Sequence, residues 1–170
     1  QLVRSGTGSI TPAEAARIRA TLESMFDVLR TTDDATPDAA GELRRAIEFW
    51  SGMCAIDFTL DESVEALLAS DPDIGETVLV TSLEIINNAI RHGKAKHLTL
   101  SIRRSTVDLI SIEATNDGQP LGAFERGLGM SMFDELTVQW SLTSGKRTTF
   151  TGFVAARQPA PASMVVAPSA

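Results

Sequence analysis

The sequence predicts an α+β fold, a two-layer sandwich in which helices pack on one face of a mixed, mostly antiparallel sheet of about five strands. Two patterns predict it. Apolar residues recur at spacings of three and four early in the chain, whereas apolar and polar residues alternate from residue 98 onward. A doubly wound parallel sheet fits this order less well. The 170 residues are 43% apolar and 22% charged, which suits a globular domain with a sizeable core.

The N-terminal part of the chain divides into a predicted leader and a predicted helix. Residues 1–10 are rich in glycine and serine, which favours a flexible leader. Residues 11–36 are assigned to an N-terminal connecting helix, which Thr11 and Pro12 begin as N-cap and first helical residue, and a polar loop over 31–39 follows. The apolar stripe of this helix fits either an ordinary core helix or a connecting or dimerising helix that joins the domain to upstream parts.

The predicted main domain spans residues 37–156 and begins with helices around one strand. Apolar spacing predicts a helix over 42–53, and alternation predicts a half-buried strand over 55–60. A long helix is expected over 72–91, and Gly93 is expected to end it in a left-handed cap.

The rest of the domain is predicted to be mainly strands. The expected elements are strands over 98–103 and 110–114 joined as a hairpin, a short helix over 131–136, and strands over 138–142 and 150–155. The last residues, 157–170, are rich in alanine, proline and serine and are predicted to be a disordered tail.

Composition excludes several classes of function. The formal charge is −7 and the pI is about 4.8, which argues against direct binding of nucleic acid. With only Cys54, His92 and His97, the chain lacks ligands for a zinc site and bases for most catalytic triads. No run approaches the ~18 apolar residues of a membrane span, and no signal peptide is evident. We expect a cytoplasmic domain without membrane contact, and an anchor elsewhere in a longer protein stays open.

Polar side chains recur along one face of the long predicted helix. Glu84, Asn88 and His92 are spaced four apart, so they form a row beside the apolar stripe. A carboxylate and a carboxamide at this spacing can hold a divalent cation or its waters, because hard cations prefer oxygen ligands. The same row also fits a solvated helix face with one cap.

Two further motifs follow predicted strands. The run Asn116, Asp117, Gly118, taken alone, is an ordinary turn. Gly127 and Gly129 stand at the entrance of a short helix, where unpaired N–H groups and the helix dipole can hold phosphate. A flexible loop explains these glycines equally well.

Taken together and in this order, the three motifs resemble those of the ATP-binding domain of two-component sensor histidine kinases, in the superfamily that includes gyrase and MutL. The stretch EIINNAIRHGKAKHLTL resembles the N box of that family, NDGQP a weakened G1 box and GLGM the G2 box. The resemblance covers about residues 40–156. It implies a Bergerat-type ATP-binding fold, and the short gap between Gly118 and Gly127 resembles the branch with compact ATP lids.

The resemblance also implies roles for individual residues. Asn88 corresponds to the asparagine that binds Mg²⁺, and Glu84 to the glutamate that acts as a base or polarises the attacking group. Asn116 stands where the family has an aspartate that accepts a hydrogen bond from the adenine amino group. The residues implied to bind ATP are Asn87, Asn88, His92, Lys94, Asn116, Gly118, Arg126, Gly127, Leu128, Gly129 and Met130.

The chain departs from the family in ways that leave alternatives open. Pro120 replaces a second glycine, and the expected N-terminal helix contains no phosphate-accepting histidine. The function implied is therefore transfer of the γ-phosphoryl group of Mg·ATP to a histidine outside this chain, on a dimerisation element, with a response regulator as partner and a homodimer possible. The alternatives are a serine kinase that restrains a sigma factor, and a degenerate nucleotide-binding or scaffold domain without phosphotransfer.

Overall fold

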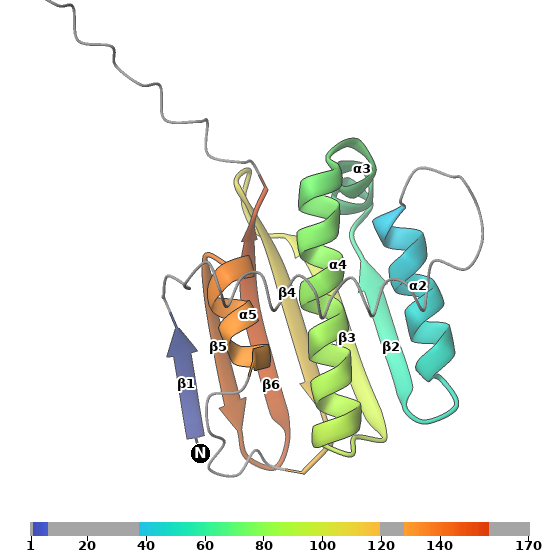
Figure 1. Cartoon of the computed structure of the whole chain (residues 1–170), viewed down its shortest axis with the longest axis vertical. Helices are drawn as coiled ribbons and strands as arrows, with labels where there is room; N and C mark the ends of the chain where they lie inside the picture. Colours follow the sequence, from blue (N-terminus) through green and yellow to red (C-terminus); the bar gives the residue numbers. More distant parts are fainter. Residues whose placement is uncertain (1, 7–37, 120–127, 157–170) are drawn as a thin grey trace, which may run out of the picture.

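The computed structural model describes residues 2–6, 38–119 and 128–156, which form a sheet with helices on one face (Figure 1). The strands are β1 (Leu2–Gly6), β2 (Ala55–Leu60), β3 (His97–Arg104), β4 (Leu109–Asn116), β5 (Gln139–Ser144) and β6 (Thr148–Ala155). The helices are α2 (Ala39–Trp50), α3 (Glu62–Ser70), α4 (Pro72–Asn87) with its π-helical extension η1 (Asn88–His92), and α5 (Leu128–Leu136). The predicted α+β class is confirmed.

The sheet is mixed and mostly antiparallel, in the order β1-β5-β6-β4-β3-β2. Among the described strands, only β2 and β3 pair in parallel, and α3 and α4 form the crossover between them. Hairpins join β3 to β4 and β5 to β6. The last strand, β6, lies between β4 and β5, so the end of the described chain occupies the middle of the sheet.

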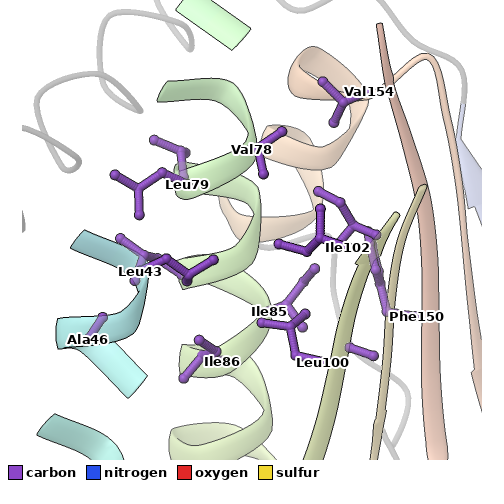
Figure 2. Close-up of a cluster of buried hydrophobic side chains, with 14 of the residues drawn as sticks. Leu43, Ala46, Val78, Leu79, Ile85, Ile86, Leu100, Ile102, Phe150 and Val154 are labelled. Atoms are coloured by element: carbon purple, nitrogen blue, oxygen red, sulfur yellow. The ribbon is translucent and has the colours of Figure 1, made fainter. Parts of the chain in front are cut away.

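The core lies between α4 and the inner face of the sheet (Figure 2). Ile85 and Ile86 of α4 are buried together with Leu100 and Ile102 of β3, and Leu43 of α2 packs along the outer side of α4. Apolar side chains of this size contribute roughly 1.5–3 kcal/mol each when fully buried. The packed core therefore fixes α4, which carries the candidate Glu84 and continues into η1 at the candidate Asn88.

The structure corrects three of the predicted elements. Residues 2–6, expected in a flexible leader, form β1 and pair with β5, so the described sheet has six strands where about five were expected. Backbone pairing to an existing edge strand has no signature in composition. The helix predicted over 42–53 begins at Ala39 instead, and β5 begins at Gln139 instead of Val138, which is 57% exposed.

Helix α3 was missed by the sequence analysis, although its signals are present. Asp61 caps it, because its carboxylate accepts a hydrogen bond from the backbone N–H of Ser63 at 2.9 Å. Val64 and Leu68, four residues apart, are its buried residues.

The connecting helix expected within residues 11–36 and the tail expected over 157–170 lie outside the described residues. Within the described ranges, no helix is long and apolar enough to cross a lipid bilayer.

Candidate functional site

Glu84 and Asn88 form a hydrogen-bonded pair at the end of α4. They lie one helical turn apart, and the Asn88 side-chain nitrogen Nδ2 donates to Glu84 Oε1 at 2.9 Å. Burial raises the pKa of the Glu84 carboxyl above its ordinary value, and the hydrogen bond from Asn88 offsets part of that rise. A carboxyl with a raised pKa is suited to accept a proton near neutral pH.

The same hydrogen bond fixes the direction of the Asn88 amide. Because Nδ2 faces Glu84, the other end of the planar amide, Oδ1, points away from that carboxylate and can serve as an oxygen ligand. No group of three or more His, Cys, Asp or Glu side chains that could hold a metal ion occurs among the described residues. This donor set fits Mg²⁺, which takes one or two protein ligands and completes its shell with phosphates and water.

The helix ends in a wider turn than expected. Residues Asn88–His92 are π-helical, and the N–H of Gly93 donates to the Asn88 carbonyl at 2.9 Å. The left-handed residue is Lys94, with φ of 55°, whereas Gly93 remains right-handed, so the predicted cap at Gly93 is wrong by one residue. The extra residue in the π turn moves the reversal of the chain one position onward.

Gly93 is needed at that position for a different reason. A Cβ atom there would lie 2.7 Å from the carbonyl oxygen of Ala89. The candidates His92 and Lys94 flank it, and both are exposed. Asn87, the remaining candidate of this segment, is half-buried as the last residue of α4.

The turn that follows β4 touches the end of η1. The N–H of Gln119 donates to the Gly93 carbonyl at 2.6 Å. At Gly118, a Cβ atom would lie 2.6 Å from the same carbonyl oxygen and 2.8 Å from Asn116 Oδ1, so no side chain fits without a shift of the backbone. The N-box and G1-like segments, 25 residues apart in sequence from Gly93 to Gly118, are therefore in direct contact.

Asn116 is buried at 9% exposure, and its side chain closes the turn. Its Oδ1 accepts a hydrogen bond from the N–H of Gly118 at 3.0 Å. Of the two ends of a side-chain amide, only the oxygen can accept from a backbone N–H. This contact therefore identifies which end of the Asn116 amide is Oδ1 and which is the NH₂ group. The amide NH₂ group is therefore on the other side and can donate to a ligand.

Asp117 was not singled out by the sequence analysis, yet it is the most strongly bonded side chain of the turn. Its Oδ1 accepts from the backbone N–H groups of Lys96 at 2.8 Å and His97 at 2.9 Å, and its Oδ2 lies 2.9 Å from His97 Nδ1. These bonds hold the pKa of the Asp117 carboxyl well below its usual range. Its position after Asn116 in a turn motif was the only sequence signal.

Arg91 was also missed. It lies three residues after Asn88 in η1, and its guanidinium carbon is 5.7 Å from the centre of the Trp50 ring of α2. This cation–π contact joins the end of the candidate helix to the end of α2.

An aromatic cluster holds α5 against the sheet. The ring of Phe133 lies 4.6 Å from that of Phe150 and 5.7 Å from that of Trp140, measured between centroids, and Trp140 Nε1 donates to Asp134 Oδ1 at 2.9 Å. The helix begins at Leu128, three residues before the predicted start, so the candidates Leu128, Gly129 and Met130 form its first turn. Pro120, Arg126 and Gly127 lie outside the described residues.

The fold is that of histidine kinase ATP-binding domains. The histidine kinase domain of a blue-light activated kinase from Erythrobacter litoralis matches with a TM-score of 0.54 and 16% identity, over 84% of this chain and 79% of that chain. The histidine kinase AdeS of Acinetobacter baumannii matches with a TM-score of 0.50 and 16% identity, over 86% and 79%. The ATP binding domain of PrrB from Mycobacterium tuberculosis matches with a TM-score of 0.51 and 16% identity, over 74% and 100%.

Comparison by sequence gives no such relatives. No protein-family model matches the chain. No curated protein matches it either.

Proposed function

We propose that this chain binds Mg·ATP and transfers its γ-phosphoryl group to a histidine that lies outside the chain. The observation that carries the proposal is the direct contact at Gly93 between the segment that holds the Glu84–Asn88 pair and the Asn116–Gly118 turn, within a histidine kinase fold. In that arrangement one segment offers an oxygen ligand and a base, and the other offers groups for a nucleobase.

The chemistry asks for positioning more than for covalent help. When bound by Asn88, Mg²⁺ neutralises charge on the phosphates during transfer. A ring nitrogen of the acceptor imidazole forms the new N–P bond while the bond from the γ-phosphorus to the bridging oxygen of ADP breaks. The Glu84 carboxylate then accepts the proton released from the other ring nitrogen, for which its raised pKa suits it.

Asn116 suits adenine better than guanine. Its amide presents an acceptor, Oδ1, next to a donor, NH₂, and the contact with Gly118 N–H keeps the two ends from exchanging. A carboxamide in this orientation pairs with an amino donor next to a ring-nitrogen acceptor, as adenine offers. Guanine reverses the pattern, so GTP should bind more weakly by roughly 1–3 kcal/mol.

The phosphates have several candidate partners. Lys94 and His92 are exposed at the end of η1, and the first N–H groups of α5 have no acceptor within their own helix, as at any helix start. Arg126 and Gly127 complete the proposed set.

The proposed partners follow from the chemistry. The only two histidines of the chain, His92 and His97, lie within this domain, so the acceptor belongs to a histidine-bearing dimerisation element of the same longer protein or of a second chain. A response regulator would take the phosphoryl group onward, and a homodimer would bring two domains to two acceptors. Dependence on ATP and the free Cys54 thiol support a cytoplasmic location for the proposed activity.

Calorimetry tests the binding step. If Asn88 ligates Mg²⁺, Asn88→Ala should weaken Mg·ATP at least about tenfold but leave metal-free ATP nearly unchanged, because the lost oxygen matters only when the ion is present. The matched control is Thr77→Ala. It also removes a polar side chain from α4, but at a position away from the site. Equal losses with and without Mg²⁺ would make Asn88 a structural residue.

Incubation of the full-length protein with radiolabelled ATP tests the transfer step. An acid-labile, alkali-stable phosphoryl group supports the histidine kinase. Acid-stable label on serine of an added protein supports a kinase that restrains a sigma factor. Binding of ATP without any label supports a scaffold or a nucleotide sensor.

A further inference from the structure

We propose that Asp117 is a positioning residue that fixes the base-binding turn against the end of the helix that holds the cation ligand. This inference rests on the proposed function. Asp117 would not touch the nucleotide. It would act through Asn116 and Gly118 on one side and through the segment 93–97 on the other.

The first step is the number and direction of its bonds. One carboxylate oxygen of Asp117 accepts from two consecutive backbone N–H groups, those of Lys96 and His97, and the other oxygen meets the His97 ring. The N–H of Asp117 in turn donates to the His97 carbonyl at 3.2 Å. Four contacts thus tie one residue of the turn to the start of β3.

The second step is the segment that these bonds hold. Residues 93–96 connect η1 to β3, and at their helical end Gly93 and Ala95 donate to the carbonyls of Asn88 and Ala89. Asp117 holds their other end. Because the segment is held at both ends, the Gly93 carbonyl stays in the position where it accepts from Gln119 N–H. In that position its oxygen leaves no room for a side chain at Gly118.

The third step is the separation of roles between neighbours. Successive side chains at the end of a strand point to opposite sides. Asn116 is buried and closes the turn through Gly118, whereas the Asp117 side chain is 37% exposed and faces the connecting segment. In this proposal the Asp117 carboxylate holds the turn in place, and the neutral Asn116 amide contacts the nucleotide base.

Hydrogen exchange on the ligand-free chain tests the coupling without any nucleotide. In Asp117→Ala, the amides of Lys96 and His97 should exchange faster, and so should those of Gly118 and Gln119, whose N–H groups donate to Asn116 and Gly93 and not to Asp117. Amides in the middle of the β3–β4 ladder should keep their protection. If only Lys96 and His97 lose protection, Asp117 is a local cap and the proposal is overturned.

Nucleotide binding supplies the second test. Asp117→Ala should weaken Mg·ATP by about tenfold or more and bring the ratio of ATP to GTP affinity toward one, because a displaced turn no longer reads the base. Asp117→Asn should largely restore both, since its amide oxygen still accepts from the two backbone N–H groups. His97→Ala removes one contact only and should have a small effect.

Asp61→Ala is the matched control, because Asp61 also accepts two hydrogen bonds at a turn but caps α3 away from the site. It should lower the melting temperature and leave the affinity ratio unchanged. An unchanged ratio in Asp117→Ala, with a loss of stability like that of the control, would overturn the proposal. A wild-type chain that binds no nucleotide would instead reject the proposed function, and the exchange experiment would still decide whether Asp117 couples the two segments.

Discussion

At the scale of single residues, the site depends on amides whose direction is set by one neighbour. Glu84 fixes the Asn88 amide, and the N–H of Gly118 fixes the Asn116 amide. In each case the contact sets which atoms face the proposed ligand: an oxygen at Asn88, and at Asn116 the second lone pair of Oδ1 next to the NH₂ group. Substitutions at Glu84 or Gly118 that remove these contacts should therefore also change the direction of these amides.

Glu84→Gln should separate stability from activity. Burial raises the pKa of Glu84 above its usual 4.5, so the folded state binds its proton more tightly than the unfolded state does. The free energy of unfolding therefore falls as pH rises from the usual value through the folded pKa, and it stays lowered above that pKa. Gln cannot ionise and still accepts from Asn88, so the variant should melt higher than wild type at pH 7 and equally near pH 3.

The same variant should lose phosphotransfer by about 10²–10⁴-fold, because an amide cannot accept the proton. Melting curves at the two pH values and a phosphorylation assay check both parts. A variant that melts lower than wild type at pH 7 would show that burial of the ionised Glu84 carboxylate does not destabilise the folded state.

At the scale of elements, the end of α4 departs from regular geometry where the candidate site begins. The π turn of η1 and the left-handed Lys94 bring Gly93 against Gly118. A left-handed conformation costs a residue with a side chain about 1–2 kcal/mol relative to glycine. That strain lies at the residue for which we propose contact with phosphate.

Lys94→Gly should stabilise the ligand-free chain and weaken ATP binding. Relief of the left-handed strain, less the entropy that glycine loses on folding, gives an expected gain of about 0.5–1 kcal/mol. The lost charge should weaken Mg·ATP severalfold at low salt and less at high salt. Lys94→Asn, which tolerates the left-handed conformation, should show the same loss of affinity, and chemical denaturation measures the stability. A Lys94→Gly variant that is less stable than wild type would contradict this account.

At the scale of the whole molecule, the described core and the described part of the site lie within residues 38–156. β1 pairs with the outer edge of β5, and within the described part of the chain no other strand pairs with β1. β6, in contrast, lies between β4 and β5 and contributes Phe150 and Val154 to the core. The two ends of the described chain therefore differ in their importance for folding.

A fragment of residues 38–156 should fold and bind Mg·ATP within about threefold of the 170-residue chain. It should melt a few degrees lower, because the edge of β5 loses its partner. A fragment that ends at residue 119 lacks α5, β5 and β6 and should not give a cooperative transition. Circular dichroism melts and calorimetry on both fragments check this, and failure of the first to fold would show that the N-terminal residues complete the core.

Much of this architecture could be predicted because periodicity is local. Alternation in β3, β4 and β6 and the apolar spacing in α4 reflect which side of each element is buried, so these elements and the α+β class follow from the sequence. The spacing of four between Glu84 and Asn88 likewise placed both on one helix face, and their hydrogen bond agrees. Helix α3 was missed, although Asp61 is a residue type typical of a helix N-cap.

The sequence by itself determined the elements and the candidate pair on α4, and the tertiary structure decided which segments meet. Periodicity reports that a strand has a buried face, but it does not specify the neighbours, so the central place of β6 and the addition of β1 required the assembled sheet. The contact of Gly93 with Gly118, the left-handed Lys94 and the direction of Asp117 depend on residues more than 20 positions apart or on a π turn. Such contacts form only when α4 packs on the sheet and brings the end of η1 next to the turn after β4. No local sequence pattern specifies which distant segment becomes the neighbour.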